Sequence, residues 1–408
     1  MIGHIYSFYG RLSVASTDVE LFRRSNLPPA YFCYGTKDPF VNEFSACAKA
    51  LQQAGVPVES NVLQGWPHGY GARGDWVPDF DRWLTNIFQN DYESQRRTKE
   101  IVENQVAAAK GHHLTSADRI RDLVSHPAFG NFGPLILPWD GLASDANMPL
   151  RDIGSLLPYH SHVNPDGVVS ALNHLIDEVN NGKTIFYDFY TESEKQAEPG
   201  RTNTGLFFVR GKPGAPFAIV APGGGFSYVA SVHEGFPYAV EISQKGFNAF
   251  VLKYRAGCGS ACAIQDMAAA ITFILRNAEM LGVGTKDYSL WGSSAGARMA
   301  AAIGSHGVRS FGGADLPKPS TVVMAYTGHS DCSSDEPATF VVVGEQDAIA
   351  PPSAMQRRVD ALRRGGTDVE FHKYPNLGHG FGPGTGTSAE GWIADAIRFW
   401  GQRISTVR

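Results

Sequence analysis

The chain has 408 residues, of which 43% are hydrophobic and 18% are charged, and its formal net charge is −5. These values are ordinary for a globular enzyme, and the length predicts roughly two domains. The negative charge argues against a nucleic-acid-binding protein, and no run reaches the roughly 18 apolar residues of a membrane span.

The N-terminal segment is interpreted as a separate unit over residues 1–91. An apolar strand near residues 29–38 ends at Asp38. Further along the chain, His68 is followed by glycines at 69 and 71. A helix is predicted over 76–87. The first twelve residues lack the basic and apolar regions of a secretory signal, so a cytoplasmic protein is expected. A start inside a truncated gene would instead make the protein a secreted one.

Residues 92–182 are interpreted as a connecting or cap region. The pattern predicts a polar helix over 96–110, a loop over 131–150 and an amphipathic helix over 166–181. Two histidines, His160 and His162, have a spacing that can chelate a metal from a strand. Because no third ligand is evident, structural or pocket-lining roles are favoured, and neither a metal nor another cofactor is expected.

A third region, residues 183–408, begins with a strand over 183–190 that opens a sheet. A second strand, over 216–220, runs into three glycines at 223–225. Glycines let main-chain N–H groups approach a developing oxyanion without interference from side chains. We therefore expect Gly224 and Gly225 to supply two oxyanion donors.

The five cysteines are expected to be reduced thiols, since the count is odd and no signal is evident. Cys258 and Cys262 lie four residues apart in a glycine-containing stretch. A metal or redox pair is one interpretation of this spacing, and an ordinary loop before the helix over 266–281 is the favoured one.

Residues 292–296 read Gly-Ser-Ser-Ala-Gly, between an apolar strand and a helix-forming run. This Gly-x-Ser-x-Gly pattern, in that context, is typical of a sharp strand-to-helix turn that presents its serine as a nucleophile. Ser294 is the candidate nucleophile. The N–H of Ala295, the next residue, is the third expected oxyanion donor.

A serine nucleophile needs a base, and the base needs an orienting carboxylate. A buried strand over 338–343 is followed by Asp347, at the edge where parallel sheets carry chemistry. A further strand over 369–374 is followed by His379, between two glycines. The chain order Ser, Asp, His favours acyl transfer on an α/β sheet.

With these motifs, residues 200–408 resemble an α/β-hydrolase-fold serine carboxylesterase, similar to bacterial feruloyl and acetyl esterases and hormone-sensitive-lipase-like esterases. The resemblance implies a mostly parallel sheet flanked by helices. It also implies a small-molecule or polysaccharide-linked substrate, such as a short-chain or aromatic carboxylic ester, including acetyl or feruloyl esters of plant polysaccharide. Pro222 stands where the lipase-like group usually has histidine, which favours the polysaccharide-esterase branch.

The N-terminal unit aligns with the segment that contains Asp347 and His379, with nearly the same spacing between Asp38 and His68. We predict a partial second copy of the hydrolase C-terminal half, without a nucleophile and with a packing role. Its sheet edge must pair with the main sheet, with residues 100–200 or with another subunit, so a homodimer is one alternative. The alternatives for function are a serine peptidase of the same fold and a non-catalytic hydrolase-like binding protein.

Overall fold

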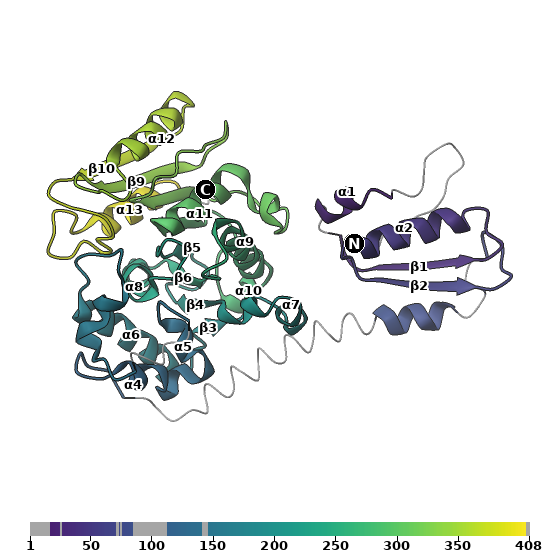
Figure 1. Ribbon diagram of the computed structural model, residues 1–408, viewed down its shortest axis with the longest axis horizontal. Helices are drawn as coiled ribbons and strands as arrows, with labels where there is room; N and C mark the ends of the chain where they lie inside the picture. Colours follow the sequence, from purple (N-terminus) through teal and green to yellow (C-terminus); the bar gives the residue numbers. More distant parts are fainter. Residues whose placement is uncertain are drawn as a thin grey trace. The chain divides into compact units, whose positions relative to one another are not determined.

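The computed structural model describes residues 17–24, 27–70, 73, 76–84, 112–140 and 146–404. The chain divides into two compact units, residues 1–96 and 97–408, and each is described by itself (Figure 1). The polar helix predicted over 96–110 lies outside the described residues. No helix among these ranges is long and apolar enough to cross a membrane.

The N-terminal unit is a two-stranded parallel sheet with helices on both faces. Ala30 pairs with Val58 and Gly35 with Leu63 at the two ends of the register. Successive strand residues face opposite sides of a sheet: Tyr34 stacks on Phe44, while Tyr31 contacts the rings of Phe80 and Trp83. The elements are α1 (Val19–Arg24), β1 (Ala30–Gly35), α2 (Val41–Gln53), β2 (Val58–Leu63) and a helix over 76–84.

The second unit is built on an eight-stranded sheet with the order β10-β9-β8-β7-β5-β6-β4-β3. The strands from β10 to β6 are parallel, and β4 and β3 continue the sheet in antiparallel pairing. The central strands are buried along their whole length and largely apolar, as expected for parallel strands covered on both faces. Their bounds are β3 (Phe186–Tyr187), β4 (Gly205–Val209), β5 (Phe217–Ala221), β6 (Asn248–Lys253), β7 (Ser289–Ser293), β8 (Thr321–Ala325), β9 (Ala338–Gly344) and β10 (Val369–Tyr374).

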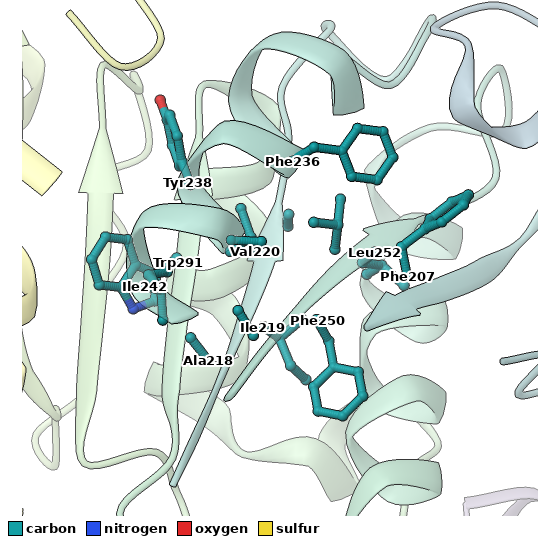
Figure 2. Close-up of a cluster of buried hydrophobic side chains, with 14 of the residues drawn as sticks. Phe207, Ala218, Ile219, Val220, Phe236, Tyr238, Ile242, Phe250, Leu252 and Trp291 are labelled. Atoms are coloured by element: carbon teal, nitrogen blue, oxygen red, sulfur yellow. The ribbon is translucent and has the colours of Figure 1, made fainter. Parts of the chain in front are cut away.

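Helices pack on this sheet through apolar side chains. Phe236 and Ile242 of α8 lie over Val220 and Leu252 of the strands, with Trp291 beside them (Figure 2). Helices α8 and α13 contact each other, as do α9 and α11. The helices are α4 (Ile120–Val124), η1 (Pro127–Phe132), α5 (Gly133–Ile136), η2 (Leu150–Leu156), α6 (Pro165–Asn180), α7 (Glu192–Ala197), η3 (Pro199–Asn203), η4 (Ser231–Gly235), α8 (Phe236–Gln244), α9 (Ser260–Arg276), α10 (Ala278–Leu281), α11 (Ala295–His306), η5 (Val308–Phe311), α12 (Pro352–Arg364) and α13 (Trp392–Gly401).

Residues 112–182 belong to the same compact unit as the sheet. The amphipathic helix predicted over 166–181 is confirmed as α6, whose apolar face is buried and packs on α8. The loop predicted over 131–150 is wrong in part, because η1 and α5 occupy its start. Pro134 is tolerated in the first turn of a helix, and burial of Phe132 and Ile136 stabilises the two turns.

The expectation of reduced cysteines is wrong for one pair. Cys258 and Cys262 form a disulfide, with their Cα atoms 6.1 Å apart, within the ordinary range for such a bond. The turn that precedes α9 brings the two residues together, which their spacing alone does not dictate. Cys33, Cys47 and Cys332 are free thiols.

Candidate active site

Ser294 lies at the turn between β7 and α11. Its φ of 50° is in the left-handed region, which is uncommon for a residue with a side chain. Two glycines make the turn feasible. A Cβ on Gly292 would lie 2.2 Å from the backbone of Gly296, and a Cβ on Gly296 would lie 1.8 Å from the carbonyl oxygen of Ala221. The sharp turn therefore requires both glycines of the Gly-x-Ser-x-Gly pattern and leaves Ser294 half-buried.

His379 connects Ser294 to Asp347. Its Nε2 lies 2.9 Å from the Ser294 Oγ, and its Nδ1 lies 2.7 Å from the Asp347 Oδ2. The second carboxylate oxygen of Asp347 accepts the N–H groups of Ile349 (2.9 Å) and Ala350 (2.7 Å). These bonds hold the carboxylate in place, and both Asp347 and His379 are buried. The structure thus brings together the three side chains that the sequence singled out.

The glycine loop after β5 passes beside Ser294. A Cβ on Gly223 would lie 2.9 Å from the Ser294 Cβ, and the Gly223 N–H donates to Glu234 Oε2 at 2.6 Å. The φ angles of Gly224 and Gly225 are 127° and 62°, values that favour glycine. Ala295 is the first residue of α11, so its N–H has no carbonyl partner within the helix. The oxyanion role of Gly224, Gly225 and Ala295 stays a prediction.

Sequence reasoning missed Glu234, a completely buried carboxylate in η4. Burial raises its pKa, but the charge of nearby His160 and the hydrogen bond from Tyr326 outweigh that effect and lower the pKa to about 2. The carboxylate is therefore ionised at neutral pH. One signal was available in the sequence, since Glu234 stands within a largely apolar run between Phe226 and Ile242.

His160 contacts protein groups on both sides of its ring. Its Nδ1 lies 2.9 Å from the Tyr228 hydroxyl, and its Nε2 lies 3.0 Å from Glu234 Oε1. His162 adopts a left-handed φ of 54°. In the part of the chain that the structure describes, no group of three or more His, Cys, Asp or Glu side chains could hold a metal ion. The geometry thus gives His160 a structural role.

Three family models match different parts of the chain. The model described as BD-FAE matches residues 209–316, which include the glycine loop and Ser294. The prolyl oligopeptidase family model matches 321–406, which include Asp347 and His379. The model described as α/β-hydrolase fold matches 10–72. The chain has an α/β-hydrolase fold.

Two curated proteins resemble this chain. Endo-1,4-beta-xylanase B of Butyrivibrio fibrisolvens is 26% identical over 43% of this chain and 34% of its own length. Acetylxylan esterase of Xylanibacter ruminicola is 22% identical over 44% of this chain and 43% of its own length. The chain therefore spans less than half the length of either relative.

Solved structures also resemble it. An acetyl ester-xyloside bifunctional hydrolase from Caldicellulosiruptor lactoaceticus is 21% identical, with a TM-score of 0.44, over 49% of this chain and 88% of that chain. An esterase from Thermogutta terrifontis is 17% identical, with a TM-score of 0.43, over 49% of this chain and 89% of that chain.

The N-terminal unit contains a second contact between a histidine and an aspartate. His68 Nδ1 lies 2.9 Å from the Asp38 Oδ2, thirty residues apart in the chain, and His379 and Asp347 are separated by thirty-two. The backbone hydrogen bonds match as well. The N–H groups of Thr36 and Lys37 donate to Leu63 and Trp66, as those of Glu345 and Gln346 donate to Tyr374 and Leu377.

The Asp38–His68 pair differs from its counterpart in exposure, because 46% of the His68 side chain is accessible to solvent, against 5% for His379. No serine accompanies the pair within the described residues in the manner of Ser294. The internal repeat stays a prediction.

Proposed function

We propose that this protein is a serine carboxylesterase that works through an acyl-enzyme on Ser294. The observation that carries the proposal is the continuous hydrogen-bond chain from the Ser294 Oγ through His379 to Asp347. A hydroxyl this close to an imidazole can lose its proton as it attacks, and the carboxylate holds the ring in the required tautomer.

The proposed reaction has two halves. The Ser294 Oγ attacks the ester carbonyl carbon while His379 Nε2 takes the hydroxyl proton. The bond from that carbon to the alcohol oxygen then breaks, and His379 gives its proton to the leaving alcohol. Water next attacks the acyl-enzyme, losing a proton to His379, which returns it to Ser294 as the acid leaves.

The negative charge that forms on the carbonyl oxygen in both halves needs donors. We assign the N–H groups of Gly224, Gly225 and Ala295 to this charge. Ala295 follows Ser294 directly, and the two glycines follow Gly223, which packs against Ser294. Preorganised donors of this kind contribute about 3–4 kcal/mol each to transition-state stabilisation. This assignment predicts no requirement for a metal or an organic cofactor.

Acetyl groups on xylan-type polysaccharide are the proposed substrate class. The similarity to an acetylxylan esterase supports it, and so does Tyr159, a residue that is 46% exposed beside the glycine loop. A Cβ on Gly225 would lie 3.2 Å from the Tyr159 ring. An exposed aromatic face at that place can pack on the sugar ring that bears the ester.

The second candidate is a serine peptidase of the same fold, favoured by the match of residues 321–406 to the prolyl oligopeptidase family model. That segment contributes Asp347 and His379, which an esterase and a peptidase would use in the same way. The match therefore supports the acid–base pair more strongly than it supports a peptide substrate.

The test compares p-nitrophenyl acetate, an acetylated xylo-oligosaccharide and an aminoacyl p-nitroanilide as substrates of the full chain. We expect hydrolysis of both esters, none of the anilide, and loss of ester hydrolysis in Ser294→Ala. Hydrolysis of the anilide alone would favour the peptidase. No turnover of any of the three would favour a binding protein.

A further inference from the structure

Glu234 forms the centre of a buried polar cluster beneath the active site. Its Oε2 accepts the Gly223 N–H at 2.6 Å. Its Oε1 accepts the Tyr326 hydroxyl at 2.6 Å and lies 3.0 Å from His160 Nε2. The side chains of Glu234 and His160 are 0% and 1% exposed. Each of the three partners comes from a different segment of the chain.

The first segment is the glycine loop. Because Gly223 packs against Ser294 while its N–H is held by Glu234, the carboxylate determines how the peptide units of Gly224 and Gly225 approach the nucleophile. A loop with left-handed glycines has many accessible conformations. A strong, charge-assisted hydrogen bond at its start restricts them.

The second segment is the loop around His379, residues 378–384, here called the histidine loop. Glu234 reaches it through Tyr326, which directly follows β8. The Tyr326 hydroxyl donates to Glu234 and accepts the Gly382 N–H at 3.2 Å. The Tyr326 ring also packs edge-on against His379, with centroids 5.0 Å apart. Tyr326 thus couples the carboxylate to both the backbone and the ring of the histidine loop.

The third segment contains His160 and reaches the same histidine loop by another route. The Ser161 hydroxyl donates to the carbonyl oxygen of His379 at 2.8 Å, and the Ser161 N–H donates to that of Gly380 at 3.0 Å. His160 precedes Ser161 directly. Its contact with Glu234 therefore helps to hold Ser161 where it donates to the histidine loop.

We propose that Glu234 is a positioning residue that holds the glycine loop and the histidine loop in register around Ser294. Its consequence for catalysis rests on the proposed esterase function, whereas its effect on the two loops does not. A buried carboxylate costs several kcal/mol of desolvation and is retained only with well-placed partners. Here the partners belong to the segments that the reaction needs.

The geometry also requires a carboxylate and not an amide. Gly223 and Tyr326 both donate, one to each carboxylate oxygen, and His160 Nε2 faces the same group. The amide of Gln has one acceptor oxygen and one NH₂ donor. Glu234→Gln therefore removes the charge and leaves one acceptor oxygen for two donors in a fully buried site, with little change in volume.

The experiment compares Glu234→Gln with Glu241→Gln, a half-buried glutamate on the neighbouring α8 that takes no part in the cluster. With p-nitrophenyl acetate, we expect kcat of Glu234→Gln to fall on the order of 10²-fold, the scale of a lost oxyanion donor. KM should change little, because the loops act mainly in the transition state. Glu241→Gln should match the wild type in both constants.

Hydrogen exchange gives a readout that does not depend on catalysis. In Glu234→Gln, peptides over 221–229 and 378–384 should exchange faster, while a peptide over 296–306 in α11 keeps its wild-type rate. Unchanged exchange in both loops would overturn the proposal. Inactivity of the wild-type chain on every ester would instead overturn the proposed function and leave the exchange result to decide the role of Glu234.

If Glu234→Gln does not fold, Tyr326→Phe provides the test. It removes one hydroxyl and keeps the ring against His379. We expect faster exchange over 378–384 only and a fall in kcat on the order of tenfold, the scale of one hydrogen bond worth about 1.4 kcal/mol. Wild-type exchange and wild-type kcat in a folded Tyr326→Phe protein would contradict the proposal.

Discussion

The Oγ of Ser294 lies 2.9 Å from Nε2 of His379, although 85 residues separate them in the chain. The contact exists because β7 and the loop after β10 end at the same edge of a parallel sheet, where α/β proteins gather their chemistry. The half-buried serine and the buried histidine are therefore within hydrogen-bond distance, as the proposed nucleophile and base need to be.

Replacing the nucleophile is the most direct test of this pair. Ser294→Ala should lower kcat on p-nitrophenyl acetate on the order of 10³-fold or more, as loss of a triad nucleophile does. Ser293→Ala is the matched control, because the Ser293 hydroxyl is buried and contacts Tyr238 instead of His379. A fluorophosphonate label recovered on Ser293 would refute the choice of serine.

The orienting carboxylate is predicted to be Asp347 and not Glu345. Asp347 contacts His379 at 2.7 Å and is buried, whereas the Glu345 side chain is exposed. Asp347→Asn should lower kcat by about 10³–10⁴-fold, because the amide favours the wrong tautomer of the imidazole. Glu345→Gln should stay within about twofold of the wild type. The reverse ranking of the two variants would show that the assignment is wrong.

Substrate preference is predicted to depend on Tyr159, whose exposed ring lies beside Gly225. Aromatic packing contributes about 0.5–1.5 kcal/mol, so Tyr159→Ala should raise KM for an acetylated xylo-oligosaccharide roughly two- to tenfold. KM for p-nitrophenyl acetate, which has no sugar ring, is the internal comparison and should change less. Equal increases for both substrates would remove Tyr159 from the sugar-binding surface.

Acid should destabilise the fold through His233. Burial lowers the pKa of this histidine to about 4, so the folded protein keeps it neutral while the unfolded chain protonates it near pH 6.5. Between pH 6.5 and 4 the unfolded state binds up to one more proton than the folded state. The free energy of unfolding therefore decreases as the pH is lowered, by up to about 1.4 kcal/mol per pH unit. Urea unfolding at several pH values measures this slope.

In His233→Gln, residue 233 cannot bind a proton in the unfolded state. The free energy of unfolding should therefore change less with pH between 6.5 and 4 than it does in the wild type. His329, whose pKa burial also lowers to about 4, acts in the same direction and remains in both proteins. Identical slopes for the two proteins would show that His233 does not contribute to acid sensitivity.

The sequence predicted the parts of the site that depend on local pattern. Asp347 and His379 each follow a strand, and the glycines around Ser294 are required by the turn itself. The Glu234 cluster could not be predicted, because its members come from segments up to 166 residues apart, His160 and Tyr326, and their contact depends on tertiary packing. The short helices at 127–136 were missed for a similar reason, since burial of Phe132 and Ile136 outweighs a loop-like composition.

The N-terminal acid–base pair is predicted to be dispensable for the chemistry. His68→Ala should leave kcat on a small ester within about twofold, because a general base acts only within roughly 3 Å of the hydroxyl that it deprotonates. In the described residues, His379 already occupies that place beside Ser294. His379→Ala is the matched control and should lower kcat on the order of 10³-fold or more.

Deleting residues 1–90 should affect the protein in a different way. The N-terminal unit exposes Leu21, Phe40, Val62 and Val77. Among its described residues the sheet has two strands, and unpaired strand edges favour pairing with other polypeptide. We expect the deletion to change the oligomeric state, solubility or melting temperature of the protein while kcat on p-nitrophenyl acetate stays near the wild-type value. Size-exclusion chromatography and thermal unfolding measure the first effects. A folded His68→Ala protein whose kcat falls roughly a hundredfold, the scale of a lost general base, would mean instead that the N-terminal pair takes part in the reaction.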